Sequence, residues 1–283
     1  MEYSGSKYYS TIKGLKRFVE WYLRLNIYYQ LLPFLIVYLL KAYFDQRPVL
    51  VGDEPRYLMF AHNLLNGYYS PPSPDINLWN GPGYPVFLMP FLSLGLPLVY
   101  IRLMNGFLLY FALVLSYKSF RYYTSSKPAL LFTLTLGLYF PVWHSLSLIL
   151  TECLSWFLVT LIIFMFTRYS AKDHKRVIHL LLLAGILAVL VMTRIIFGYV
   201  LLFMLVISLI GLMSTSFRST ARKSAYVFAL ASLMCIPWLV YTHHITGKVF
   251  YWGNSGGMSL YTLSSPCKDD NGSWKNTAAL RKS

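Results

Sequence analysis

The sequence predicts an all-α integral membrane protein, a bundle of about seven transmembrane helices. Hydrophobic residues make up 57% of the 283 residues and charged residues only 12%, which is about half of the charged fraction in a soluble domain. The apolar residues fall into long runs, each close to the roughly 20 residues that cross a bilayer as a helix. Basic residues gather in every second connection between these runs, as in multi-pass membrane proteins.

The predicted spans are the apolar runs taken in chain order. They cover residues 26–44, 98–117, 128–145, 147–167, 177–193, 195–213 and 225–241. The first run contains Lys41 near its end, where a long side chain can extend its ammonium group to the interface. An odd number of spans places the two ends of this membrane core on opposite sides of the bilayer.

The basic residues predict the orientation of the bundle. Fifteen of the 25 lysines and arginines lie before the first span or between spans two and three, four and five, and six and seven, so alternating spans put these fifteen on one side. The positive-inside rule makes that side cytoplasmic. The net charge of +15 is therefore a signal of topology, and we expect no nucleic-acid partner. We expect a multi-pass protein of the plasma (inner) membrane in a bacterium or archaeon, or of the endoplasmic reticulum in a eukaryote.

The chain divides into three parts. Residues 1–25 are basic and rich in aromatic residues, as in an amphipathic helix that lies on the cytoplasmic leaflet. Residues 26–241 form the membrane core, which includes a long outer loop at 45–97. Residues 242–283 form a polar outer tail that ends without a further span. We expect this tail to be truncated or altered relative to a longer protein.

The outer loop is expected to carry short interfacial helices. Residues 54–66 can form one such helix, with Tyr57 and Ala61 on its apolar side. The following segment, YYSPPSPDINLWNGPGYP, contains too much proline and glycine for a long helix. A short apolar stretch at 86–96 then lies at the membrane interface before the second span.

Three acidic residues on the outer side are the candidate catalytic groups. Asp53 and Glu54 follow the first span in GDEPRYLMFAHNLLNG, where a carboxylate can act as a general base on an acceptor hydroxyl or can cap the next helix. Glu152 follows Thr151 inside an otherwise apolar run. An acid at that depth usually faces a cavity, although a carboxylate at the interfacial start of a helix is the alternative.

Arginines on the outer side break the positive-inside trend and are the candidate ligands of a phosphate. Arg102 lies near the outer start of the second span, and Arg194 lies in the short connection between spans five and six. A guanidinium group suits phosphate oxygens, and ion pairing with the outer acids is the alternative. Arg56 can serve either purpose.

Tyr57, Asn80 and Tyr84 complete the predicted sugar- or phosphate-binding residues. Asn80 and Tyr84 belong to NGPGYP, a rigid turn that can line a pocket. The sequence shows no His/Cys spacing of a metal site, no phosphate-binding glycine loop and no dinucleotide fingerprint. We therefore predict no protein metal site and no nucleotide.

In their order along the chain, these segments resemble the membrane glycosyltransferases of the GT-C fold. The nearest resemblance is to family 39, which contains the protein O-mannosyltransferases and the bacterial aminoarabinose transferases. It rests on GDEPRYLMFAHNLLNG, NGPGYPVFLMPF, the TE before span four, the TR after span five and PWLVYTHHITGKVFYWGNSGG. These motifs extend over about residues 26–265, nearly the whole chain.

The resemblance implies a cell-envelope glycosylation enzyme. Such an enzyme transfers a sugar from a polyprenyl-phosphate donor to a lipid, glycan or protein acceptor on the non-cytoplasmic face, with inversion at the anomeric carbon. It implies Asp53 as the base or the acceptor-orienting residue, and Glu54 as the second acid of that motif. It also implies Glu152 as the acid at the start of span four and Arg194 as the partner of the donor phosphate. Some enzymes of this fold use a divalent cation, which leaves one open as a cofactor.

The chain departs from the family in two places. Many relatives carry a lysine before the second span, whereas WNGPGYP has none, so that phosphate contact must come from arginine, Asn80 or the backbone. Relatives also usually continue with further spans or a soluble domain, which puts the activity of this chain alone in question. A membrane transporter and a non-catalytic relative of the fold are the alternative functions.

Overall fold

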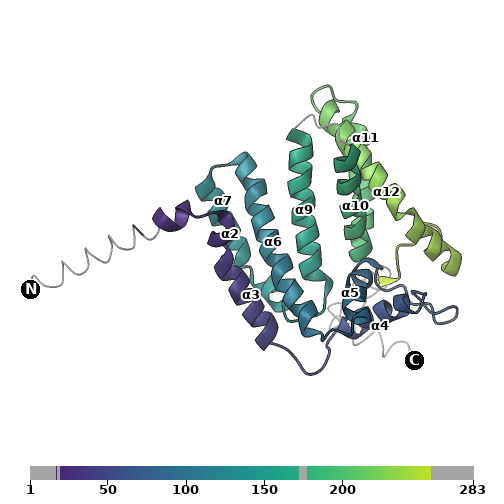
Figure 1. Ribbon diagram of the computed structural model, residues 1–283. Coiled ribbons are helices and arrows are strands. Elements are labelled where there is room, and N and C mark those ends of the chain that lie inside the picture. Colours follow the sequence, from purple (N-terminus) through teal and green to yellow (C-terminus); the bar gives the residue numbers. More distant parts are fainter. Residues whose placement is uncertain (1–16, 18–19, 172–176, 256–283) are drawn as a thin grey trace, which may run out of the picture.

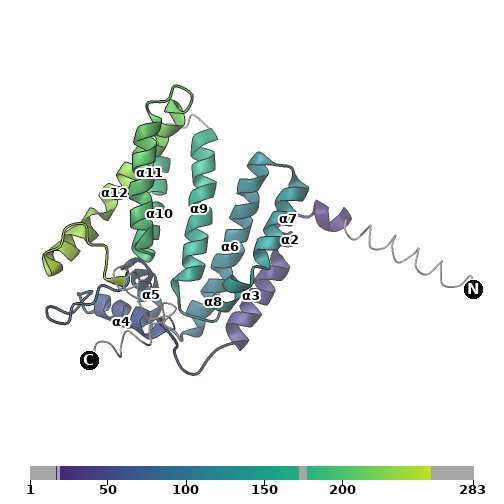
Figure 2. The same ribbon diagram turned by 180° about the vertical axis from the view of Figure 1, so that it is seen from behind.

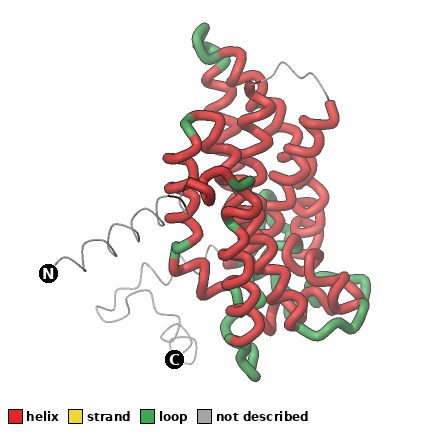
Figure 3. The backbone as a smooth tube through the Cα atoms, turned by 60° about the vertical axis from the view of Figure 1, so that its left-hand side comes forward, coloured by secondary structure: helices red, strands yellow, loops and turns green. Residues whose placement is uncertain are grey.

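The computed structural model describes residue 17, residues 20–171 and residues 177–255. Within these residues every regular element is a helix, in agreement with the predicted class (Figure 1). Figure 3 shows that helix accounts for most of the described backbone. Most of the 1–25 lead and most of the 242–283 tail lie outside the described residues, so their predicted arrangement stays a prediction.

Several of the described helices have the length and composition of membrane-spanning segments. Three are long and apolar enough to cross a bilayer: α6 (Val99–Tyr123), α9 (Thr151–Ala171) and α12 (Arg218–Thr246). Four are apolar but shorter: α3 (Leu32–Phe44), α5 (Gly83–Ser93), α10 (Val177–Thr193) and α11 (Ile196–Gly211). The structure is thus that of a helical membrane protein, and the number of seven spans stays a prediction.

Two of the predicted spans are interrupted in the structure. The first divides at Leu31 into α2 (Ile27–Gln30) and α3. The third divides into α7 (Ser126–Gly137) and α8 (Phe140–Ser145), because Tyr139 adopts an extended backbone with a ψ of 105°. Both second helices have a proline in their first turn. Proline lacks an N–H and fits the first turn of a helix, so it starts a new helix where it cannot continue the old one.

The helices pack in a row that places α6 and α10 in the interior. The α6 helix packs against α3, α7 and α9, and α10 packs against α9, α12 and α5, while α11 packs against α12 (Figures 1 and 2). One cluster of buried side chains joins α4 (Glu54–Leu65), α5, α10 and α12, and a second joins α3, α6 and α8. The start of α9 contributes to both clusters.

The two ends of the bundle differ in chemistry. The α6–α7 and α11–α12 connections, whose basic residues predicted the cytoplasmic side, lie at the upper end in Figure 1. The α4 and α5 helices lie at the opposite end. The predicted helix at 54–66 is α4, with Tyr57 and Ala61 buried, and residues 68–82 contain no helix. The predicted apolar stretch before span two is α5.

Candidate functional site

A polar cavity of about 410 Å³ lies at the end of the bundle that carries α4 and α5. Its walls come from the start of α4, the loop before α5, the start of α9 and the α10–α11 turn. Five of the predicted site residues line it: Asp53, Tyr57, Asn80, Glu152 and Arg194. The alternation of spans thus brings together residues that are up to about 140 positions apart in the sequence.

Asp53 lies at the N-terminal boundary of α4 and is available to the cavity. Its side chain makes no capping hydrogen bond to the helix, so Asp53 does not cap α4 through its carboxylate. It forms an ion pair with Arg56, and the aspartate side chain is 45% exposed. The guanidinium carbon of Arg56 lies 5.1 Å from the centre of the Trp79 ring. Arg56 is therefore held between a carboxylate and an indole, as in a cation–π contact.

Glu152 and Arg194 form the second ion pair of the cavity. The Arg194 Nη2 atom lies 3.5 Å from Glu152 Oε1, and both side chains are partly exposed. Glu152 comes from the first turn of α9, whereas Arg194 comes from the tight turn between α10 and α11. The other carboxylate oxygen, Oε2, is buried and has no hydrogen-bond partner within the described part of the chain. This oxygen can accept a hydrogen bond from a bound molecule.

Tyr57 and Asn80 supply neutral hydrogen-bonding groups. The Asn80 Nδ2 atom donates to the Tyr57 hydroxyl at 3.0 Å, and the Tyr69 hydroxyl donates to the backbone carbonyl of Asn80 at 2.6 Å. Burial raises the pKa of Tyr57 to about 12, a hydrogen bond with Thr151 opposes this rise, and Asp53 and Glu152 add to it. The phenol of Tyr57 therefore stays neutral near pH 7 and remains a hydrogen-bond donor.

Four predicted site residues do not line the cavity: Arg56, Glu54, Arg102 and Tyr84. Glu54 is fully buried, and Arg102, which is 5% exposed, places Nη2 3.8 Å from its carboxylate. Successive residues on a helix point about 100° apart, so Asp53 and Glu54 cannot face the same space. Tyr84 is also fully buried, with its ring centre 5.0 Å from that of Tyr57 and no hydrogen-bond partner for its hydroxyl in the described structure.

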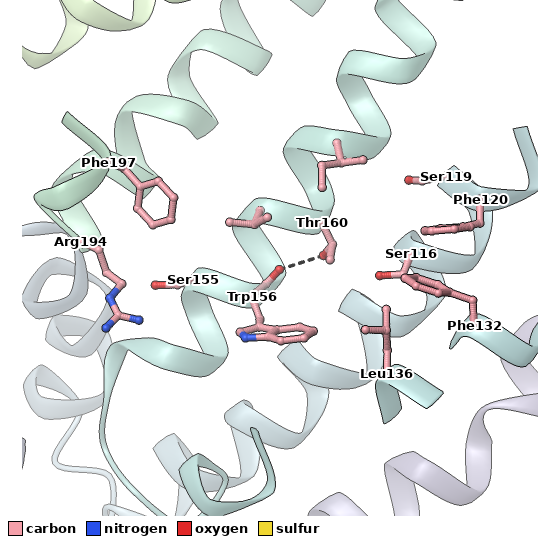
Figure 4. A pocket seen from close by; sticks show the side chains of 12 residues that line it. Ser116, Ser119, Phe120, Phe132, Leu136, Ser155, Trp156, Thr160, Arg194 and Phe197 are labelled. Atoms are coloured by element: carbon pink, nitrogen blue, oxygen red, sulfur yellow. Dashed lines mark hydrogen bonds between the residues drawn. The ribbon is translucent and has the colours of Figure 1, made fainter. Parts of the chain in front are cut away.

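A second, mainly apolar cavity of about 350 Å³ shares Arg194 with the first. It lies between α9 and the α6–α7 pair, and we call it the α9 groove (Figure 4). Arg194 and Ser155 lie at one end, and Phe120 and Phe132 lie at the other. The Ser155 hydroxyl is buried and has no hydrogen-bond partner among the described residues. This groove was not predicted from the sequence, because serines in an apolar run carry little signal.

Several polar residues that support the cavity were also not among the predicted site residues. Trp79, Thr151 and Thr193 line it directly. Asn105 is fully buried in the second turn of α6, and its side chain contacts the backbone before α9. An amide inside an apolar run is costly to bury, so among these four residues only Asn105 could have been predicted from the sequence.

The described residues contain no cluster of three His, Cys, Asp or Glu side chains able to hold a metal ion. A divalent cation as cofactor is implied only by the family resemblance, which leaves it open. Comparisons with known proteins found no matching family model, no matching curated protein and no matching solved structure. The resemblance to the membrane glycosyltransferases therefore stays a prediction from the sequence.

Proposed function

We propose that the chain is a membrane glycosyltransferase of the GT-C type that uses a polyprenyl-phosphate sugar donor on the non-cytoplasmic face. The observation that carries the proposal is the position of Arg194 between a polar cavity and an apolar groove. A donor of this class has an apolar chain, an anionic phosphate and a polar sugar in that order. The α9 groove, the guanidinium group and the cavity offer matching surfaces in the same order.

The residues of the cavity suit an inverting transfer. Asp53 takes the proton of the acceptor hydroxyl as that oxygen attacks the anomeric carbon. The bond between this carbon and the phosphate oxygen breaks, and the phosphate leaves with the electron pair. Arg194 stabilises the negative charge that develops there, while Glu152 holds the guanidinium group in place. Tyr57 and Asn80 donate hydrogen bonds to the sugar, in a cavity whose 410 Å³ lies within the usual range for small ligands.

A transfer assay tests the proposal. Purified protein in detergent is incubated with radiolabelled polyprenyl-phosphate hexoses and candidate acceptors, beside Asp53→Asn. We expect donor turnover by the wild type and a loss of about 100-fold or more in the variant, because a general base contributes about that much. Asp75→Asn is the matched control, since Asp75 is exposed in the 68–82 loop and does not line the cavity.

The groove has its own test. Val159→Trp fills the α9 groove and is expected to raise the KM for the donor. Val206→Trp makes the same change on α11 at a side chain that is 52% exposed, and should leave the KM unchanged.

Equal turnover by wild type and Asp53→Asn would contradict the proposal. Movement of the substrate across vesicles without donor consumption would favour the transporter, and no turnover with any donor, even in a longer version of the chain, would favour the non-catalytic relative.

A further inference from the structure

The short segment between α8 and α9, residues 146–150, is held in place by side chains from other parts of the chain. It is not helical, and it leads directly into the first turn of α9, where Glu152 lies. Non-helical backbone inside a bundle leaves N–H and C=O groups that need partners. Buried side chains of α4 and α6 supply them here.

Asn105 supplies the donor. Its side chain is fully buried, and its Nδ2 atom lies 2.8 Å from the carbonyl oxygen of Leu148 and 3.3 Å from that of Leu146. The carbonyl of Ser145 lies at 3.5 Å from the same nitrogen. One amide group on α6 therefore binds carbonyls on both sides of the turn, and a side chain without a hydrogen-bond donor cannot replace it.

Glu54 supplies the acceptor. Its Oε1 atom accepts a hydrogen bond from the Ile149 N–H at 2.8 Å, and its Oε2 atom accepts one from the Val51 N–H at 2.8 Å. The carboxylate thus joins the chain before α4 to the chain before α9. Arg102 lies close enough to balance its charge. A buried carboxylate is stable only with such partners, so all of them are needed for the contact.

We propose that Glu54 and Asn105 are positioning residues that set the distance between the two acids of the cavity. Glu54 is the chain neighbour of Asp53, and Ile149, its hydrogen-bond partner, lies three residues before Glu152. The adjacent acids therefore divide their roles: Asp53 faces the cavity, and Glu54 joins α4 to the start of α9. The catalytic consequence rests on the proposed function, whereas the structural contact can be tested without it.

Hydrogen exchange of the backbone is the direct test. Glu54→Gln leaves one acceptor oxygen and turns an N–H₂ group toward a backbone N–H, so one of the two bonds is lost. We expect exchange in peptides that cover 146–152 to rise about tenfold or more, while peptides of α11 keep the wild-type rate. Glu152→Gln is the matched control, because it neutralises an acid in the first turn of α9 whose ion pair is with Arg194, and exchange in residues 146–150 should not change.

Ser147→Ala provides a milder variant in case Glu54→Gln does not fold. The Ser147 hydroxyl donates to Asp45 Oδ2 at 3.1 Å, so its loss should speed exchange in the same segment by a smaller factor. Unchanged exchange in this segment for both variants would overturn the proposal. A uniform rise over all helices would do so too, because it would show general destabilisation.

Kinetics then separate positioning from catalysis. If Glu54 positions the acids, Glu54→Gln lowers kcat and keeps the acidic limb of the pH–rate profile, because the base, Asp53, is still present. If Glu54 is itself the base, turnover and that acidic limb disappear while exchange stays as in the wild type, which overturns the proposal. If the wild-type protein shows no turnover, only the proposed function is contradicted. The positioning role of Glu54 and Asn105 is still tested by hydrogen exchange.

Discussion

Replacing Gly81 with alanine tests whether the cavity depends on close contact between the loop before α5 and the end of α10. A Cβ atom on Gly81 would lie 2.1 Å from the carbonyl oxygen of Met192. Since carbon and oxygen atoms approach to about 3.3 Å, the loop or the helix end must move by about 1.2 Å. Asn80 and Arg194 lie beside these two points, so the displacement falls on the walls of the cavity.

The expected effect is large on activity and moderate on stability. A misplacement of about 1 Å can cost roughly 100-fold in rate, and overpacking costs about 1–3 kcal/mol of the free energy of unfolding. Donor turnover and thermal unfolding in detergent measure the two effects. Gly185→Ala is the control, because it makes the same change within α10, where the nearest atom lies 3.9 Å from the new Cβ. Equal behaviour of the two variants would refute the reasoning.

Two further predictions concern pH. Burial raises the pKa of Tyr57 to about 12. The buried neutral phenol therefore stabilises the fold below about pH 10, and this stabilisation is lost as the pH rises toward 12. The melting temperature of Tyr57→Phe should fall less over that window than the melting temperature of the wild type. Hydrogen bonds from Lys41 and then Ser147 lower the pKa of Asp45, so its stability is present above about pH 4 and lost as the pH falls further. Asp45→Asn should therefore show a smaller fall in melting temperature between about pH 5 and pH 3. If the melting temperatures of a variant and of the wild type fall equally over its pH window, the role given to that residue is contradicted.

The apolar runs located the helices of the core because burial in lipid requires continuous hydrophobic sequence. The long runs became α6 and α9, but two others divided where a proline follows closely. Pro33 and Pro141 lie in the first turns of α3 and α8, and they mark where the second helix of each divided run begins. Run length alone does not distinguish one helix from two, since both bury similar apolar residues.

The site was only partly predictable. Alternating spans brought Asp53, Glu152 and Arg194 to one end of the bundle, and this followed from the sequence. Which of Asp53 and Glu54 faces the cavity depends on the rotation of α4, which its short apolar pattern does not fix. The contacts of Asn105 depend on the non-helical path of residues 146–150, and no periodic pattern encodes such a path.

Photo-crosslinking of a donor analogue tests the central claim most directly, namely that one lipid-linked sugar occupies both the polar cavity and the α9 groove. The analogue carries a diazirine in the isoprene unit next to the phosphate, and labelled peptides are located by mass spectrometry. We expect label on α9 between Ser155 and Ile163, competition by unlabelled donor, and strongly reduced labelling in Arg194→Gln. Label spread over exposed side chains such as Phe203, or equal labelling in Arg194→Gln, would contradict it.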